Sequence, residues 1–370
     1  MSSGGAPAAP AISLCMIVRD EEQKLARCLA AAQPVVDEVV IVDTGSTDAT
    51  RDIAAASGAR VADFRWCDNF SAARNRSLEL ARGAWALVLD ADELLASVDA
   101  RERLLDFARS AGVPAGQVEL ENLTDDGARS RTLLTRFFDL RVGLRYVRRV
   151  HEQLTLNGRT ISGRPTGVHV IHDGYSRAAL AGRDKLARNE ALLRATLADS
   201  PDDGYDWYQL GRTLEVGARF PEALEAYEQA IERAKDSDPH LPHLFECAAT
   251  CLRAVGRSQH ALDWLSEVAP LFPERPDMVF LVALLAMDVG ELERAERGFL
   301  RCLELGARPG RATAAESATA ATTIAPLHNL GVLYEFTGRP VKAREAYERA
   351  LELRPEHRGA RDGLQRLGLG

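Results

Sequence analysis

Short apolar runs alternate with helical patterns through the first part of the chain. Apolar residues dominate 12–18, 37–42, 59–63 and 84–89. Runs of this length, without regular polar alternation, predict strands that are covered on both faces of a sheet. Strands that alternate with helices in this way predict an α/β domain with a mostly parallel, Rossmann-like sheet and right-handed crossovers.

The helices of this layout are expected at 19–32, near 46–57 and at 72–81, the last capped by Ser71. The pattern then becomes less regular. A charged helix is expected at 96–111, followed by strands at 117–123 and 132–140 and an extended stretch at 144–156.

Past Arg183 the pattern changes to apolar residues at helical spacing, rich in Ala, Leu, Glu and Arg. Glycines at 217, 256, 290 and 338 are 39, 34 and 48 residues apart. The 34-residue interval, together with Trp207-x-x-Leu210-Gly211 and Ala-x-x-x-Tyr, resembles tetratricopeptide repeats. The longer intervals are ascribed to insertions at 235–242 and 306–323. Small residues are expected where paired helices cross closely.

Three regions follow from these patterns. Residues 1–11, rich in Ser, Gly, Ala and Pro, are expected to be a disordered lead-in. Residues 12–183 are expected to form the α/β domain. Residues 184–370 are expected to form a helical linker and the repeats, a class of array that binds peptides or proteins in a groove or pairs subunits into a homodimer.

Composition narrows the class of protein. The 370 residues carry a net charge of −8, so nucleic acid is not an expected partner. No apolar run of 18 residues is present, so no membrane span is expected. The six cysteines are scattered, without the pairing of a zinc site, and are interpreted as core residues of a reducing compartment. A soluble cytoplasmic protein is therefore expected.

The candidate chemistry centres on Asp90-Ala91-Asp92, which follows the apolar run at 84–89. Two carboxylates at a strand end can reach one divalent cation, and hard oxygen ligands suit Mg²⁺ or Mn²⁺. Ligands of parallel α/β sheets bind beyond the carboxyl ends of the strands, where Arg19 and Asp43 also fall. No glycine-rich phosphate loop is present, so a nucleotide bound here would need a metal to neutralise its phosphates.

Residues 12–93 resemble the amino-terminal half of family 2 glycosyltransferases of the GT-A fold. The resemblance lies in Met16–Glu22, Glu38–Asp48, Ala72–Asn75 and Leu87–Glu93. It implies that Asp43 binds the nucleobase region, that Asp90 meets the ribose or the metal, that Asp92 ligates the metal, and that Arg74 reaches the base or the phosphates. Arg19 is placed with them at the nucleotide-sugar site. Thr44 stands where the family often has a second Asp.

Two later segments resemble blocks of a subset of these transferases that carry helical repeats, Val150–Leu154 and Val168–Tyr175. Inverting transfer needs a carboxylate that takes the acceptor proton, and Glu152 is predicted to be this base. His172 is predicted as a third metal ligand. His169 is the weaker candidate for that role, because its alternation is opposite to that of the apolar positions around it.

The sequence thus predicts a metal-dependent, inverting glycosyltransferase with Mn²⁺ or Mg²⁺ as cofactor. By the same resemblance the donor is expected to be a uridine-diphosphate sugar. The repeats indicate a peptide or protein as acceptor or partner. Two alternatives stay open: a repeat scaffold whose nucleotide domain is degenerate, and a nucleotidyltransferase that would release pyrophosphate.

Overall fold

The computed structural model describes residues 11–110, 112–123, 129–172, 178–307 and 321–368. The described chain forms two compact units, Met1–Leu192 and Leu193–Gly370. The division lies inside a single helix, α5 (Ala178–Asp199). The expected lead-in at 1–11 and most of the expected insertion at 306–323 lie outside the described residues.

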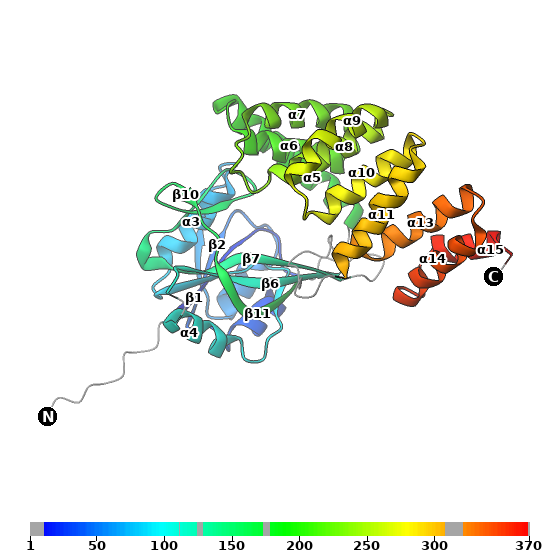
Figure 1. Cartoon of the computed structure of the whole chain (residues 1–370). Coiled ribbons are helices and arrows are strands. Elements are labelled where there is room, and N and C mark those ends of the chain that lie inside the picture. The colour runs from blue at the N-terminus through cyan, green and yellow to red at the C-terminus, as the bar shows by residue number, and fades with distance from the viewer. Residues whose placement is uncertain (1–10, 111, 124–128, 173–177, 308–320, 369–370) are drawn as a thin grey trace. The chain divides into compact units, whose positions relative to one another are not determined.

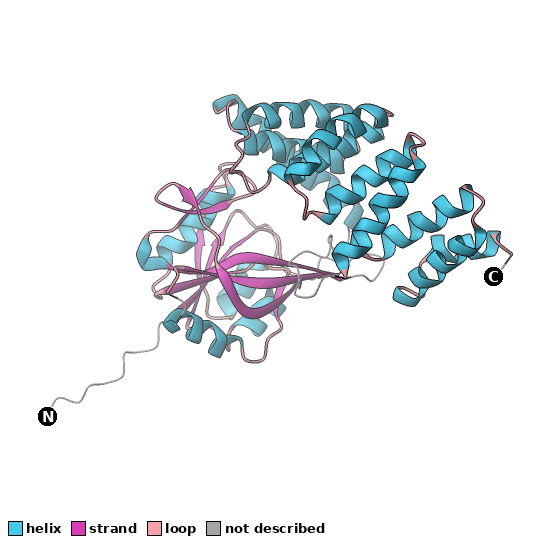
Figure 2. Ribbon diagram, viewed as in Figure 1, coloured by secondary structure: helices cyan, strands magenta, loops and turns pink. Residues whose placement is uncertain are grey.

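An eight-stranded mixed sheet forms the centre of the first unit (Figures 1 and 2). Its order is β3-β2-β1-β4-β7-β6-β11-β5. The first four strands in this order are parallel, as predicted, whereas β7 runs antiparallel to both β4 and β6 and β5 runs antiparallel to β11. The strands are β1 (Ile12–Val18), β2 (Glu38–Asp43), β3 (Arg60–Asp63), β4 (Trp85–Val88), β5 (Glu93–Leu95), β6 (Ala115–Leu123), β7 (Arg129–Asp139) and β11 (Arg164–His172).

Both faces of the sheet are covered, which explains the continuous apolar runs. In β1, Leu14 and Met16 pack into a core shared with residues of α1, α2 and α4, whereas Cys15 packs on the other side with residues of α3 and a small second sheet. The helices are α1 (Leu25–Ala32), α2 (Thr50–Ala56), α3 (Phe70–Leu80) and α4 (Ala100–Ser110). The second sheet has the order β10-β9-β8, with β8 (Arg145–Val147), β9 (Gln153–Leu156) and β10 (Arg159–Thr160).

Several helix starts differ from the prediction. Helix α2 begins at Thr50 and not near residue 46, and α4 begins at Ala100 and not at residue 96. Residues 22–24 form a turn, so α1 begins at Leu25 and not at the charged residues from Arg19 onward. The cap of α3 is Asn69, whose side chain accepts a hydrogen bond from the Ala72 amide, and not Ser71. An asparagine ranks with serine as a cap, and the local pattern alone does not decide between two capping residues that are two positions apart.

The second unit is an array of antiparallel helix pairs (Figure 1). Close crossings use the predicted small residues: a Cβ placed on Gly211 would lie 2.4 Å from the Tyr227 ring, and one on Gly331 would lie 2.4 Å from the Tyr347 ring. Both tyrosines are fully buried. The helices are α6 (Gly204–Val216), α7 (Phe220–Arg233), α8 (Leu241–Ala254), α9 (Ser258–Val268), α10 (Pro276–Asp288), α11 (Leu292–Gly306), α13 (Ile324–Phe336), α14 (Pro340–Leu353) and α15 (Arg358–Arg366).

None of the helices within the described ranges is both long enough and apolar enough to span a bilayer. The six cysteines are free thiols, and five of them are buried. Cys247 and Cys251 both lie buried on α8, in agreement with their interpretation as core residues.

Candidate active site

The acidic triplet forms a tight turn between β4 and β5. The Asp90 amide donates to Glu93 Oε2 at 2.9 Å, and the Glu93 amide donates back to the Asp90 carbonyl at 3.1 Å. Arg136, on β7, donates to Asp90 Oδ2 and to Glu93 Oε1, each at 3.0 Å. Glu93 therefore stabilises the turn through hydrogen bonds to Asp90, and the Arg136 guanidinium on the neighbouring strand binds both carboxylates.

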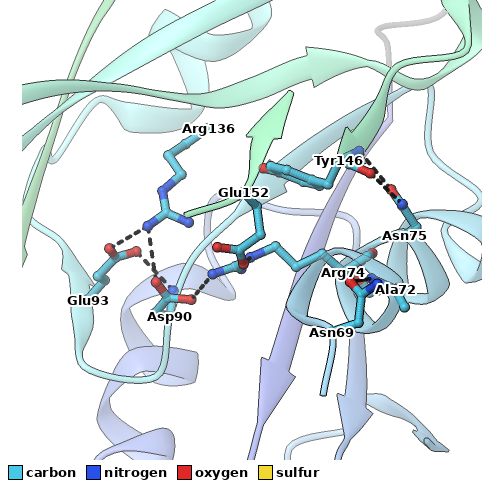
Figure 3. Close-up of polar contacts among 10 residues, drawn as sticks. Asn69, Ala72, Arg74, Asn75, Asp90, Glu93, Arg136, Tyr146 and Glu152 are labelled. Atoms are coloured by element: carbon cyan, nitrogen blue, oxygen red, sulfur yellow. Dashed lines mark hydrogen bonds and ion pairs between the residues drawn. The ribbon is translucent and has the colours of Figure 1, made fainter. Parts of the chain in front are cut away.

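Arg74 joins this turn to the predicted base (Figure 3). Its Nη2 donates to Asp90 Oδ1 at 2.8 Å, and its Nε donates to Glu152 Oε1 at 2.8 Å. Its Nη1 is buried and has no hydrogen-bond partner among the described residues. Sequence reasoning placed Arg74 on the nucleotide, and the structure shows it bridging two carboxylates, with one nitrogen left for a ligand.

The two guanidiniums set the charge of the turn. Burial alone would raise the pKa of Asp90, but Arg74 and Arg136 outweigh it and hold that pKa well below its usual range. For Glu93 burial dominates, and the pKa is raised in spite of Arg136. Asp90 is therefore ionised throughout the physiological pH range.

Glu152 is positioned through α3. The side chain of Asn75 donates to the Tyr146 carbonyl at 2.8 Å and accepts from the Tyr146 amide at 2.9 Å, which fastens α3 to β8 (Figure 3). The Phe70 amide donates to the Arg149 carbonyl at 2.8 Å. The loop that leads from β8 to Glu152 is thus tied to α3 at both ends. Arg74 and Asn75 are adjacent on α3. Arg74 orients the Glu152 carboxylate, and Asn75 holds strand β8, which precedes it in the chain.

Asp92 lies next to His172. Its side-chain partners are His172 and Lys24 and not the two arginines of this network. Strand β11 pairs with β5 so that His172 is opposite Glu93. As a result, His172 Nε2 lies 3.2 Å from Asp92 Oδ2, and Lys24 Nζ lies 3.4 Å from the same oxygen. The second ring nitrogen, His172 Nδ1, is 3.0 Å from Asn122 Oδ1, which orients the ring.

The chemistry of Asp92 and His172 fits a divalent cation of the Mn²⁺ type, because a carboxylate oxygen and an imidazole nitrogen converge. The other predicted carboxylate ligand, Asp90, has both of its oxygens on arginines. Within the described parts of the chain, no group of three or more His, Cys, Asp or Glu side chains is arranged to hold a metal.

Asp43 is buried at 2% exposure and stabilises its own loop. Its carboxylate accepts from the amides of Gly45 and Ser46 at 3.2 and 3.1 Å and from the Ser46 hydroxyl. The next loop is joined to it, since Asp20 Oδ1 accepts from the Thr47 amide at 2.7 Å. The structure thus brings Arg19 and Asp43 to one edge of the sheet, with Asp43 turned to the backbone of its loop.

A cavity of about 420 Å³ lies at the carboxyl ends of β1, β2 and β4. The predicted residues Arg19, Arg74, Asp90 and Glu152 line it. Asp43 does not line the cavity, although its neighbour Thr44 does. Asp92 and His172 are also not among the lining residues. Glu21 and His151, which belong to the motifs Met16–Glu22 and Val150–Leu154, also line it. Further lining residues outside the quoted motifs are Trp66, Phe70, Lys185, Arg188 and Asn189.

Two of the missed groups left a signal in the sequence. Arg136 is a lone charge inside an apolar strand pattern, next to Phe137 and Phe138, and such a residue requires a buried partner. Lys185, Arg188 and Asn189 follow helical i, i+3, i+4 spacing, which places them on one face of α5. Only the tertiary structure shows that this face meets the cavity.

Comparison with known proteins gives the family. Residues 13–160 match the model described as "Glycosyl transferase family 2", and residues 324–357 match a tetratricopeptide repeat. A TPR repeat-containing protein of Synechococcus elongatus is 34% identical, over 68% of this chain and 64% of its own length. The SPbeta prophage-derived glycosyltransferase SunS of Bacillus subtilis is 25% identical, over 61% of this chain and 54% of its own length. The chain thus spans less than two thirds of each of these relatives.

Two similar solved structures each cover half of this chain or less. YrrB, a TPR protein with an unusual peptide-binding site, is 21% identical, with a TM-score of 0.40, over 50% of this chain and 87% of that chain. Glucosyl-3-phosphoglycerate synthase from Mycobacterium tuberculosis, in complex with Mn²⁺, uridine-diphosphate and its product, is 25% identical, with a TM-score of 0.28, over 30% of this chain and 45% of that chain. The residues of the candidate site are not assigned from either structure.

The sheet, the carboxyl-end cavity and the matched segments agree with the resemblance in the sequence: residues 13–160 form a domain that matches glycosyl transferase family 2, and residues 324–357 match a tetratricopeptide repeat.

Proposed function

We propose that this chain is a metal-dependent, inverting glycosyltransferase that uses a uridine-diphosphate sugar. The observation that carries the proposal is the joining of Asp90 and Glu152 through Arg74 on the wall of one cavity. These two carboxylates lie 62 residues apart in the sequence. Their convergence in a family 2 domain supports a site that holds an activated donor beside a proton acceptor.

Asp92 and His172 are proposed to hold Mn²⁺ or Mg²⁺, with Asp90 as a further ligand. When bound, such an ion neutralises the charge that develops on a diphosphate leaving group. Lys24 contacts Asp92 and keeps that carboxylate oriented toward His172. Asp90 has two guanidinium partners, so it can exchange one of them for a ligand and still keep the other.

Glu152 is proposed to take the proton of the acceptor. Its side chain is 15% exposed, and its Oε1 is fixed by Arg74. As an acceptor hydroxyl or thiol loses its proton to Glu152, its oxygen or sulfur forms a bond to the anomeric carbon of the sugar. The bond from that carbon to the phosphate oxygen breaks, and the nucleoside diphosphate leaves from the opposite face, with inversion. The Arg74 guanidinium offers its buried Nη1 toward the negative charge of the leaving group.

The acceptor or partner is proposed to be a peptide or protein, because arrays of this kind bind extended chains. A cytoplasmic location is proposed on the ground that the six cysteines are free thiols. Formation of a homodimer through the repeats belongs to the same proposal.

A by-product assay tests the activity. The full chain is incubated with a panel of nucleotide sugars, with Mn²⁺ or with a chelator, and released nucleoside diphosphate is measured. We expect release with a uridine-diphosphate sugar that stops with chelator. Release of pyrophosphate from a nucleoside triphosphate would point to a nucleotidyltransferase. If no nucleotide raises the melting temperature and no product appears, the domain is a degenerate one on a repeat scaffold.

The variant Asp92→Asn sharpens this assay. It keeps the size of the side chain and its contact with Lys24, so we expect an unchanged circular dichroism spectrum and loss of the metal-dependent release. The matched control is Asp106→Asn, an exposed aspartate on α4. Full activity of Asp92→Asn would exclude Asp92 as a metal ligand.

A further inference from the structure

One face of α5 forms a wall of the cavity that no part of the proposed chemistry has used. Lys185, Arg188 and Asn189 all line the cavity together with Asp90 and Glu152. All three belong to the first compact unit, although α5 continues beyond its boundary. The wall is therefore part of the same unit as the acidic turn.

The two cations of this wall have no carboxylate within ion-pair distance among the side chains that the structure describes. Several other arginines of the first unit do: Arg51, Arg60, Arg74, Arg101 and Arg136 each pair with an Asp or Glu. Arg188 instead lies over the Phe70 ring, with its guanidinium carbon 5.0 Å from the ring centroid. Burial, and next the charge of Arg19, lowers the pKa of Arg188. Glu152 acts on Arg188 through its charge, but no carboxylate forms an ion pair with either cation within the described side chains, and two cations on one wall favour an anionic ligand.

Asn189 adds a polar group that requires a partner. The residue is only 8% exposed, and its side-chain Oδ1 is buried without a hydrogen-bond partner among the described residues. A buried acceptor in this state costs free energy unless a donor reaches it. A hydroxyl group of a ligand in the cavity supplies such a donor.

We propose that the Lys185–Arg188–Asn189 face of α5 binds the sugar-diphosphate half of the donor. The two cations contact the diphosphate, and the Asn189 oxygen accepts from a sugar hydroxyl. The aromatic pair Trp66 and Phe70, with ring centroids 4.8 Å apart, lines the same cavity and leaves an apolar surface for the nucleoside. This inference rests on the proposed function and assigns to a helix outside the matched segment 13–160 a part of donor recognition.

Binding measurements test the inference without requiring turnover. Isothermal titration calorimetry on the full chain compares uridine, UDP, UDP-glucose and inorganic phosphate, for the wild type and for Lys185→Ala, Arg188→Ala and Asn189→Ala. The control is Arg76→Ala, which removes an exposed arginine on α3 that pairs with Glu79. Circular dichroism verifies that every variant is folded.

We expect Lys185→Ala and Arg188→Ala each to weaken UDP binding about 10-fold or more, as loss of a charge-assisted contact does, and to leave uridine binding and the control unchanged. Asn189→Ala should weaken UDP-glucose more than UDP. Equal weakening of uridine and UDP by Arg188→Ala would overturn the inference, because it would mark a general effect on the cavity.

Three other outcomes also overturn it. If both alanine variants bind UDP as the wild type does but lose inorganic phosphate, the anion belongs to a phosphorylated acceptor and not to the donor. If the wild type binds UDP and the variants bind it equally well, the α5 assignment fails while the proposed function stands. If the wild type binds no nucleotide, both fail. If the wild type binds UDP but releases no nucleoside diphosphate in the by-product assay, the proposed function fails, and the inference that the α5 face binds a nucleoside diphosphate stands.

Discussion

Replacement of Arg136 by methionine tests whether the acidic turn depends on a cation from the neighbouring strand. The side chain of Arg136 is 14% exposed, and it joins Asp90 to Glu93, whose side chain is 4% exposed. Methionine keeps the volume and the apolar stem. The change therefore leaves Glu93 buried with a charge and without its cation.

Loss of one partner of a buried ion pair costs about 3–5 kcal/mol of stability. Asp90 is one-third exposed and keeps Arg74, so it contributes little to the loss. The main cost comes from Glu93, and we expect a loss near the lower end, about 3 kcal/mol. The double variant Arg136→Met/Glu93→Gln should recover most of this loss, since neutral partners leave no unpaired charge.

Urea unfolding followed by tryptophan fluorescence measures the loss. Trp85 stacks on Phe137, the residue next to Arg136, with ring centroids 4.7 Å apart, so it reports on this part of the sheet. The second unit carries its own tryptophans and gives an internal reference. The control is Arg76→Met, an exposed pair with Glu79 that is worth roughly 0.2–1 kcal/mol. The reasoning would be refuted if Arg136→Met cost no more than this control, or if adding Glu93→Gln lowered the stability further.

Three further predictions concern the base and the repeats. Glu152→Gln should lower the rate of transfer by about 10²- to 10⁴-fold and keep UDP affinity, as measured by steady-state kinetics and calorimetry; an unchanged rate would reassign the base. Gly211→Ala places a Cβ 2.4 Å from the fully buried Tyr227 ring and should lower the stability of the second unit by about 1–3 kcal/mol, as measured by chemical unfolding. Addition of Tyr227→Leu should restore part of this stability. An unchanged stability of the single variant would contradict the crossing geometry. Burial lowers the pKa of His243 to about 4 in the folded protein. As the pH falls, this histidine therefore takes up a proton in the unfolded chain before it does so in the folded protein. The stability that the neutral side chain contributes at neutral pH is lost as the pH falls from about 6.5 toward about 4. His243→Gln should flatten that pH dependence in thermal unfolding, and an equal slope in both proteins would exclude His243 as its source.

Much of the first unit could be predicted from local patterns. The apolar runs near β1, β2, β3 and β4 became parallel strands, because a strand covered on both faces needs little polar alternation. Helix starts were predicted less well, since the choice between Asn69 and Ser71 depends on backbone angles that the pattern does not contain. The antiparallel placement of β7 between β4 and β6 was also not predicted, because strand order is set by long-range pairing.

The sequence by itself determined the candidate site residues at the strand ends and the resemblance to family 2 glycosyltransferases, which the match over residues 13–160 supports. Asp90, Asp92, Glu152 and His172 were identified from motifs, because residue type and spacing are local properties. Part of the repeat array was predictable for the same reason: a glycine precedes a tyrosine by the same spacing at two close helix crossings, Gly211 with Tyr227 and Gly331 with Tyr347.

Only the tertiary structure decided how these groups are connected. It showed that Arg74 bridges Asp90 and Glu152, and it brought Arg136 to the acidic turn and the α5 face to the cavity. The physical reason is that a buried charge takes its partner from whichever strand or helix packs against it. That neighbour is set by the order of strands in the sheet, and no spacing along the chain encodes it.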